Sequence, residues 1–120
     1  MYEIEFYEDK KQKSEVYEYI KSLQNKNSKE CKQKLKKITL YIDLLSEYGL
    51  MLAEPYIKKI SDEIWELRPL RDRILFASWY NNKFVLLTVF MKQTQKTTKR
   101  EIERAKKLLK DYRKRSEEDE

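Results

Sequence analysis

The sequence predicts an α+β domain with the element order β-α-α-β-β-β-α, and three observations lead to this fold class. Apolar and charged residues alternate at the start of the chain, which indicates a strand. Two stretches with apolar residues every three or four positions follow, and they indicate helices. From about residue 63, short runs rich in β-branched and aromatic residues indicate strands, and a last amphipathic stretch indicates a helix at the end. We therefore expect helices against one face of a mostly antiparallel sheet.

The first strand is expected at residues 2–7, where Tyr2, Ile4 and Phe6 alternate with other side chains. A helix is expected from about residue 13 to 24. Its apolar stripe consists of Val16, Ile20 and Leu23. The polar residues 25–28 predict a short turn, so the two helices should form an antiparallel pair.

The second helix is predicted to end at Gly49, because glycine commonly terminates helices. Asn27, with Glu30 three residues later, resembles a capping arrangement at its start. The apolar residues of this helix recur in steps of four and three, which is typical of an amphipathic helix. They are Cys31, Leu35, Ile38, Ile42 and Leu45.

The second half of the chain begins with a connection at residues 51–60. Strands are expected at 63–68, 73–80 and 84–91. The last of these is apolar on both faces, so we place it in the interior of the sheet. Asn81-Asn82 predicts a tight hairpin turn, because asparagine tolerates positive φ.

The last helix is expected to start near Thr98, which forms a capping-box pattern with Glu101. Its apolar stripe consists of Ile102, Ala105, Leu108, Leu109 and Tyr112. The chain reads as a single domain at 1–115, followed by a frayed acidic tail at 116–120.

The composition favours a nucleic-acid partner and excludes several kinds of catalysis. The 120 residues carry a net charge of +6, which suits a polyanion. There is no histidine, which excludes Ser–His and Cys–His catalysis and makes zinc chemistry very unfavourable. We expect no metal and no cofactor. The one cysteine, Cys31, fits a reducing cytoplasm, and no apolar run is long enough to span a membrane.

Basic residues gather in two parts of the sequence. The segment from Lys92 to Arg115 carries eleven lysines and arginines against three acids. The second cluster consists of Lys58, Lys59, Arg68, Arg71 and Arg73. On the last helix we favour charges that only solvate an outer face. At Arg68, Arg73 and Lys92 we favour phosphate binding, because strand positions beside large aromatic residues are unusual places for idle charge.

Three linked motifs carry a resemblance to a known family. They are IWELR at 64–68, DRILF at 72–76 and VFMKQTQKTTKREIERA at 89–105. In this order they resemble the phage-derived HigB branch of the RelE/ParE toxin superfamily, and the match covers residues 57–110. The chain departs from the family pattern at Gln93, where the family often has lysine, and at Thr98, where it often has proline.

The resemblance implies a RelE-like fold and the toxin of a type II toxin–antitoxin system. It implies a metal-independent endoribonuclease that cleaves mRNA, typically on the ribosome, to inhibit translation and growth. The partner implied is a helix-turn-helix, HigA-like antitoxin, which would form a hetero-oligomer with the toxin in the cytoplasm. Motif alignment places Arg73 at the catalytic strand arginine of the superfamily.

RNA carries its own nucleophile, the 2′-hydroxyl, so fixed positive charge aimed at the phosphate can supply much of the catalysis. We assign Arg73 to this task, with Arg68 as a second clamp, because guanidinium groups grip two phosphate oxygens. Glu66 is a candidate general base, and a cross-strand ion pair is the alternative reading. Lys92 or Lys96 could protonate the leaving oxygen, the alternative for Lys96 being a solvated loop charge.

Further residues are candidates for RNA binding. Tyr80 and Phe90 could stack an unpaired base, as could Tyr112 with less support, although core or edge packing is the simpler reading of all three. The remaining candidates are cationic: Lys58, Lys59, Lys96, Lys99 and Arg100.

Two other functions compete with the ribonuclease. Toxins of the same superfamily that resemble ParE poison DNA gyrase and cleave no RNA. A basic RNA-binding protein without toxicity is the third possibility. A gyrase supercoiling assay beside primer extension on translated mRNA separates the first two, and expression in bacterial cells tests the third.

Overall fold

The computed structural model describes residues 1–80 and 82–118, and within them it confirms the α+β class and the predicted order of the main elements. The helices are α1 (Glu15–Gln24), α2 (Lys29–Tyr48) and α3 (Lys99–Glu118), with a short 3₁₀ turn, η1, at Gly49–Leu52. The strands are β1 (Glu3–Phe6), β2 (Ile57–Lys59), β3 (Trp65–Leu67), β4 (Asp72–Trp79) and β5 (Lys83–Met91).

The strands form one sheet in the order β1-β5-β4-β3-β2. Strand β1 pairs with β5 in parallel, and the other neighbours are antiparallel. The sheet is therefore mostly antiparallel, and β5 lies in its interior between β1 and β4, both as predicted. The expected connection at 51–60 is wrong in part, because it contains η1 and the edge strand β2.

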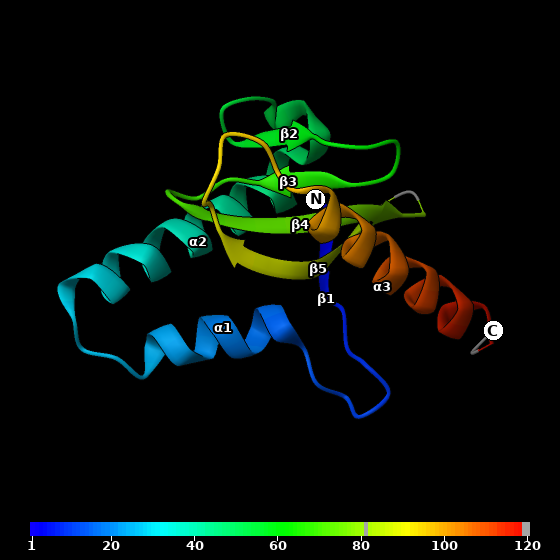
Figure 1. Cartoon of the computed structure of the whole chain (residues 1–120), viewed down its shortest axis with the longest axis horizontal. Coiled ribbons are helices and arrows are strands. Elements are labelled where there is room, and N and C mark those ends of the chain that lie inside the picture. Colours follow the sequence, from blue (N-terminus) through cyan, green and yellow to red (C-terminus); the bar gives the residue numbers. More distant parts are fainter. Residues whose placement is uncertain (81, 119–120) are drawn as a thin grey trace.

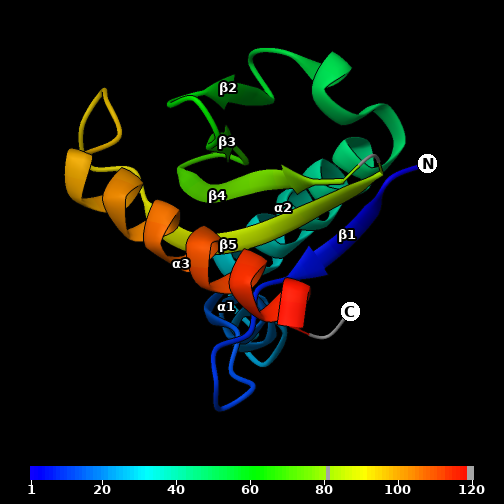
Figure 2. The same ribbon diagram turned by 90° about the vertical axis from the view of Figure 1, so that its right-hand side faces the viewer.

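The expectation that all helices cover one face of the sheet is wrong. Helices α1 and α2 lie on one face and α3 crosses the other (Figure 1, Figure 2). The alternation of β4 divides the core in two, because Ile74 and Phe76 point toward α1 and α2 while Leu75 and Ala77 point toward α3. The α3 face also buries Tyr7, Ile64, Val85, Leu87, Ala105, Leu109 and Tyr112.

The ends of the helices follow local hydrogen-bonding rules. Ser28, and not Asn27, caps α2, because its hydroxyl accepts a hydrogen bond from the amide of Cys31 at 3.1 Å. Gly49 ends α2 as predicted, with φ of 60°. A Cβ there would lie 2.6 Å from the ring of Tyr2, so glycine is also required by packing.

Two predicted features fall partly outside the described residues. The hairpin between β4 and β5 closes at the pair Trp79 and Lys83, and Tyr80 has φ of 54°, but Asn81 of the predicted turn is outside the described residues. The predicted acidic tail overlaps α3 up to Glu118, and Asp119 and Glu120 are outside the described residues. In the described ranges, no helix is both long and apolar enough to cross a bilayer.

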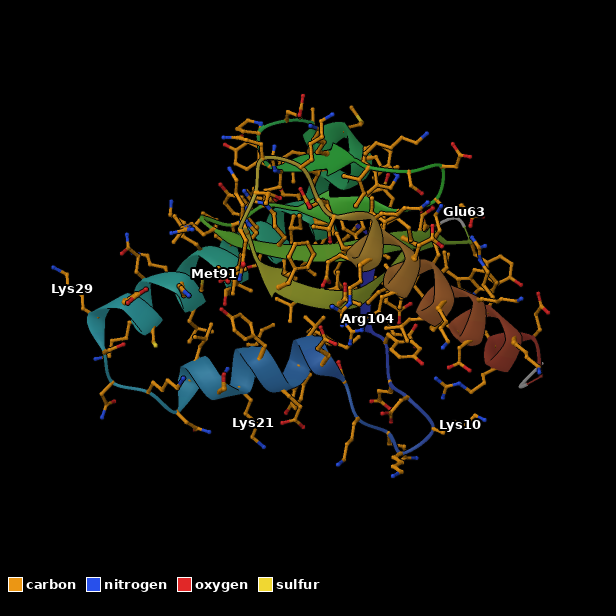
Figure 3. The ribbon with its side chains drawn as sticks, viewed as in Figure 1. Lys10, Lys21, Lys29, Glu63, Met91 and Arg104 are labelled. Carbon is orange, nitrogen blue, oxygen red and sulfur yellow. The ribbon has the colours of Figure 1, made fainter. Side chains whose placement is uncertain are left out.

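Helix α3 is joined to the first half of the chain by ion pairs and hydrogen bonds. Arg104 lies over the start of α1 (Figure 3), where it pairs with Glu15, and Glu15 also accepts a hydrogen bond from the amide of Val89 at 2.9 Å. Nearer its end, Tyr112 donates to Glu5 at 2.7 Å. These contacts fix the angle of α3 and, with it, the position of the segment that leads into the helix.

Candidate active site

A cleft of about 530 Å³ lies between the sheet and the segment that joins β5 to α3. Helix α3 covers the middle of the sheet and leaves the start of β4 and the end of β5 to this segment. The cleft is lined by Glu66, Arg73, Phe90, Met91, Lys92, Gln93, Thr94, Gln95, Lys96, Thr97, Thr98, Arg100 and Glu101. Three strands, a loop and a helix therefore contribute to one concave surface.

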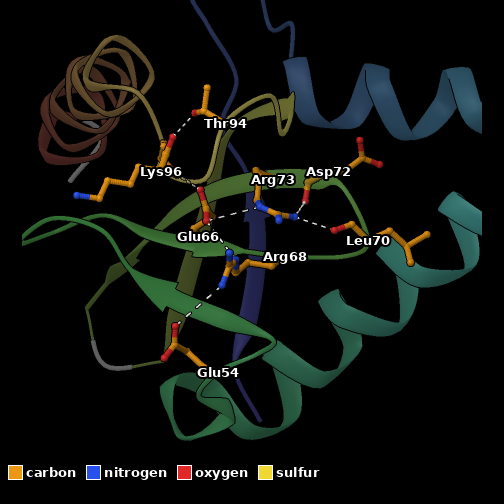
Figure 4. Close-up of polar contacts among 9 residues, drawn as sticks. Glu54, Glu66, Arg68, Leu70, Asp72, Arg73, Thr94 and Lys96 are labelled. Carbon is orange, nitrogen blue, oxygen red and sulfur yellow. Dashed lines mark hydrogen bonds and ion pairs between the residues drawn. The ribbon is translucent and has the colours of Figure 1, made fainter.

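A buried carboxylate lies at the wall of the cleft between two arginines. Glu66 is only 3% exposed, although its neighbours on β3, Trp65 and Leu67, point toward α1 and α2. Its Oε1 lies 3.4 Å from Nε of Arg68 and 3.7 Å from Nε of Arg73 (Figure 4). The pairing of charges compensates for the burial, because an isolated carboxylate would be very costly at such a position.

Arg73 is held in place by the backbone as well as by Glu66. Its Nη1 donates to the backbone carbonyl of Leu70 at 2.9 Å and to the backbone carbonyl of Asp72 at 2.8 Å. Leu70 itself has φ of 57°, an uncommon conformation for a bulky residue. Burial and the charge of Arg68 lower the pKa of Arg73, against the opposing effect of Glu66 and Asp72. Because arginine starts so high, the guanidinium stays charged at neutral pH.

Thr97 completes this cluster. It lies inside the motif at 89–105, but it was not among the site residues predicted from the sequence. Its hydroxyl donates to Oε2 of Glu66, so both carboxylate oxygens have partners. The loop is also braced within itself, because Thr94 donates to the carbonyl of Lys96 at 2.6 Å. Thr97 therefore couples the segment before α3 to the charged cluster on the sheet.

Cations line the mouth of the cleft. Lys92, Lys96 and Arg100 all belong to its lining, and Phe90 contributes an aromatic ring to the same surface. In Figure 4 the side chain of Lys96 extends away from the cluster around Glu66. Lys92 lies closer to the sheet, since its amide donates to the carbonyl of Arg71 at 2.7 Å.

A second hollow of about 500 Å³ adjoins the first one. Five residues line both hollows, namely Arg73, Lys92, Gln93, Thr94 and Gln95, and the second is completed by Leu70 and Arg71. Arg73 and Lys92 therefore border both hollows.

The structure places other sequence candidates away from the cleft. Tyr80 is exposed at the far end of the β4–β5 hairpin, eight residues beyond Asp72. Lys59 lies over the ring of Trp65, at 5.9 Å from its centroid, on the face that carries α1 and α2. Lys58 is opposite Glu66 in the register and exposed at the sheet edge, outside the lining.

Two candidates on α3 also lie outside the lining of the cleft. Lys99 is exposed on the first turn. Tyr112 is 8% exposed and packs edge-on against Trp79, with 5.7 Å between ring centroids. Burial and the hydrogen bond to Glu5 raise the pKa of Tyr112, so its hydroxyl remains a donor at neutral pH.

The charged side chains that line the cleft are mostly cationic. Its lining contains four cationic side chains against two carboxylates, and one of these carboxylates is paired with Arg68 and Arg73. Within residues 1–80 and 82–118, no three side chains of histidine, cysteine, aspartate or glutamate come together as metal ligands. The fixed guanidinium of Arg73 and the ammonium groups of the two lysines suit a phosphodiester backbone.

A comparison with known families adds to this geometry. Residues 18–110 match the family described as phage derived protein Gp49-like (DUF891). The chain belongs to this family. The Gp49-like family is one of RelE-like, toxin-like proteins of toxin–antitoxin systems. The matched range contains α2, all strands from β2 to β5, and the whole cleft. No curated protein sequence gives a significant match.

Proposed function

We propose that this Gp49-like protein is the ribonuclease toxin of a type II toxin–antitoxin pair, in the HigB branch, and that its cleft cleaves mRNA without a metal ion. One observation carries the proposal: Arg73 is fixed by Glu66 and two backbone carbonyls at the wall of a cleft whose other cations are Lys92, Lys96 and Arg100. Such a surface binds a phosphodiester and stabilises added negative charge on it.

The reaction uses the RNA itself as nucleophile. The 2′-oxygen loses its proton and forms a bond to the adjacent phosphorus, and the bond from phosphorus to the 5′-oxygen breaks. The 5′-oxygen takes up a proton and leaves as a hydroxyl, while the other product ends in a 2′,3′-cyclic phosphate. Between these steps the phosphorane carries more negative charge than the substrate, and the guanidinium of Arg73 stabilises that charge.

The other residues follow from their contacts. Glu66 has both oxygens occupied by Arg68, Arg73 and Thr97, so we assign it a positioning role. We assign the donation of the proton to the leaving oxygen to Lys92, which lines both hollows together with Arg73. Lys96 and Arg100 hold flanking phosphates, and Phe90 offers a face for an unpaired base.

The partners of the proposed toxin are an mRNA on the ribosome and an antitoxin. The ribosome supplies part of the substrate geometry by presenting the mRNA as an extended strand. The antitoxin is a HigA-like helix-turn-helix protein that neutralises the toxin in a hetero-oligomer. Co-purification with the product of the adjacent reading frame tests this partnership.

Brief induction in bacterial cells, followed by mapping of the 5′ ends of mRNA fragments, tests the function. The wild-type chain should arrest growth and produce new 5′ ends within translated mRNA. Arg73→Ala and Arg73→Lys should each lower cleavage by about 100-fold or more, because a lysine restores the charge but cannot reproduce the guanidinium's contacts with Glu66 and the two backbone carbonyls. Lys107→Gln, an exposed change on α3 outside the cleft, should cleave like wild type.

Thermal unfolding of each purified variant shows whether the loss of activity comes from misfolding. Arg100→Gln changes a second cation of the cleft. Because Arg100 is exposed, this substitution should reduce activity without destabilising the fold. Full toxicity of the Arg73 variants would overturn the site. Growth arrest with intact mRNA and inhibited gyrase supercoiling would favour the ParE-like alternative, and normal growth would favour a non-toxic RNA-binding protein.

A further inference from the structure

The proposed reaction needs a group that takes the proton from the 2′-hydroxyl, and the chain has few groups that can do so. It contains no histidine. The cleft lining contains no tyrosine, and the ammonium and guanidinium groups of its lysines and arginines are hydrogen-bond donors without an acceptor site. The remaining candidates in the lining are the carboxylates of Glu66 and Glu101.

Glu66 is a poor proton acceptor in this arrangement. Its Oε1 faces two guanidinium groups at 3.4 Å and 3.7 Å, and its Oε2 accepts from Thr97. Freeing either oxygen for RNA would break the contacts that hold Arg73. Proton transfer by Glu66 would therefore compete with the positioning of the phosphate clamp.

The carboxylate of Glu101, unlike that of Glu66, has an oxygen without a hydrogen-bond partner among the described residues. The sequence pattern predicts a capping box, in which Thr98 and Glu101 exchange hydrogen bonds. Only half of this box forms: the amide of Glu101 donates to the Thr98 hydroxyl at 3.4 Å, and among the described residues no return bond to the carboxylate is found. Oε2 of Glu101 is buried and has no hydrogen-bond partner there. A buried acceptor without a donor is costly, and a donor from a ligand would relieve that cost.

Glu101 lines the same cleft as Glu66, Arg73 and Lys92. The contact of Thr97 with Glu66 brings the start of α3 against the cluster that holds Arg73. The charged groups that line the same space are Glu66 from β3, Arg73 from β4, Lys92 and Lys96 from the loop and Arg100 from α3. Arg104 lies one turn further along α3, where its hydrogen bond to Glu15, with a smaller contribution from the charge of Glu101, raises its pKa.

We propose that Glu101 is the general base of the cleavage reaction, an inference that rests on the proposed ribonuclease function. Its carboxylate takes the proton of the 2′-hydroxyl as the bond from the 2′-oxygen to phosphorus forms. The bond from phosphorus to the 5′-oxygen breaks, and that oxygen receives a proton from Lys92. Glu101 then returns its proton to solvent, and Lys92 regains one, so the enzyme ends unchanged.

Single-turnover cleavage by the purified full chain tests this assignment, with mRNA on ribosomes and the same RNA free in solution as substrates. Four variants carry the test: Glu101→Gln, Glu101→Asp, Lys92→Gln and, as the matched control, Glu103→Gln. Glu103 lies on the same helix, exposed and paired with Lys106 at 4.0 Å, outside the cleft. Binding is measured with an RNA that has a 2′-O-methyl group at the cleaved position and so does not react.

Glu101→Gln should lower the cleavage rate by about 10²–10⁴-fold and leave the affinity for the unreactive RNA unchanged, since general-base catalysis contributes on this scale. Glu101→Asp should recover part of the rate, and Glu103→Gln should cleave like wild type. A substrate with sulfur in place of the bridging 5′-oxygen adds the decisive comparison, because a thiolate leaves without being protonated. It should rescue Lys92→Gln and fail to rescue Glu101→Gln.

Each other outcome overturns the assignment in a distinct way. Rescue of Glu101→Gln by the sulfur substrate would make Glu101 the acid. Equal losses of rate and affinity, with a lower melting temperature, would make it a structural residue of the helix start. A changed cleavage sequence at an undiminished rate would make it a reader of bases. A wild-type chain that cleaves neither RNA would overturn the proposed function itself, whereas cleavage by wild type and Glu101→Gln alike would overturn only this inference.

Discussion

The two faces of the sheet differ in what they bury. Against α1 and α2, the core cluster is made of apolar side chains over the whole width of the sheet, from Phe84 on β5 through Ile74 and Phe76 on β4 to Ile57 on β2. On the α3 face, Leu75 and Ala77 are covered by the helix, but the next residue on that side of β4 is Arg73. The same strand thus serves as core on one side and as a charged wall on the other.

The difference shows how a small domain combines stability with a polar site. A buried ion pair contributes little to the free energy of unfolding, but removing one of its partners destabilises the protein strongly. The apolar cluster on the α1 and α2 face is therefore expected to supply most of the stability, which lets the α3 face carry Glu66 and Arg73 at 3% and 6% exposure. The predictions below test this division of roles.

The largest effect on stability is expected at the apolar face. Phe76 is fully buried and packs edge-on against Phe84, with 5.6 Å between centroids. Phe76→Ala should lower the free energy of unfolding by about 3–5 kcal/mol, because it removes a large side chain and leaves a cavity. Urea denaturation measures this loss. Leu40→Ala, at an exposed position of α2, is the matched control, and an equal loss in both variants would contradict the division.

A smaller loss is expected on the α3 face. Leu109 is 1% exposed and anchors α3 beside Leu75 and Leu87. Leu109→Ala should cost about 2–4 kcal/mol in unfolding free energy. Because α3 also positions the cleft, Leu109→Ala should lose cleavage activity at temperatures where it is still folded. The control Val16→Ala, on the other face of the sheet, should keep its cleavage activity as long as it is folded. Measuring activity and circular dichroism on one sample separates the two effects.

The sequence predicted most of the elements because each has a strong local pattern. The stripe from Cys31 to Leu45 and the alternation of β3 both depend on side chains a few positions apart. The parallel pairing of β1 with β5 joins residues 80 positions apart, so no local pattern reports it. The period of α3 likewise shows that the helix has an apolar side, without showing which face of the sheet that side meets.

Part of the site could also be predicted from the sequence, because it depends on a local pattern. The alternation of β3 separates Glu66 from Trp65 and Leu67, and the structure brings Glu66 together with Arg68 and Arg73. Thr97 lies inside the motif at 89–105, but no local pattern links this loop residue to Glu66, which is 31 positions away in the chain. Lys59 was proposed without knowledge of β2, whose register sends that side chain to the opposite face.

The cations of the cleft should contribute measurably but modestly to RNA affinity. Arg100→Gln should weaken binding of single-stranded RNA and reduce the slope of log affinity against log salt concentration by about 0.7, the value for one lost phosphate contact. Lys107→Gln, on an outer part of α3, should leave the slope unchanged. Fluorescence anisotropy over a range of salt concentrations gives both slopes. Equal slopes for the two variants would mean that the helix charges act only as a diffuse field.

The smallest effects are expected at two adjacent threonines. Comparing them distinguishes a residue that supports the charged cluster from one that only stabilises the start of α3. Thr98 caps α3, so Thr98→Ala should cost about 0.5–1 kcal/mol in unfolding free energy and change cleavage only slightly. Thr97 donates to Glu66, so Thr97→Val leaves an oxygen of a buried carboxylate without its donor. Its cost in stability should be similar, about 1 kcal/mol, but it should also lower cleavage because Arg73 loses its support. Thermal unfolding beside cleavage assays measures both. If the two variants lost activity equally, the hydrogen bond from Thr97 would be part of the helix start and not of the reactive cluster.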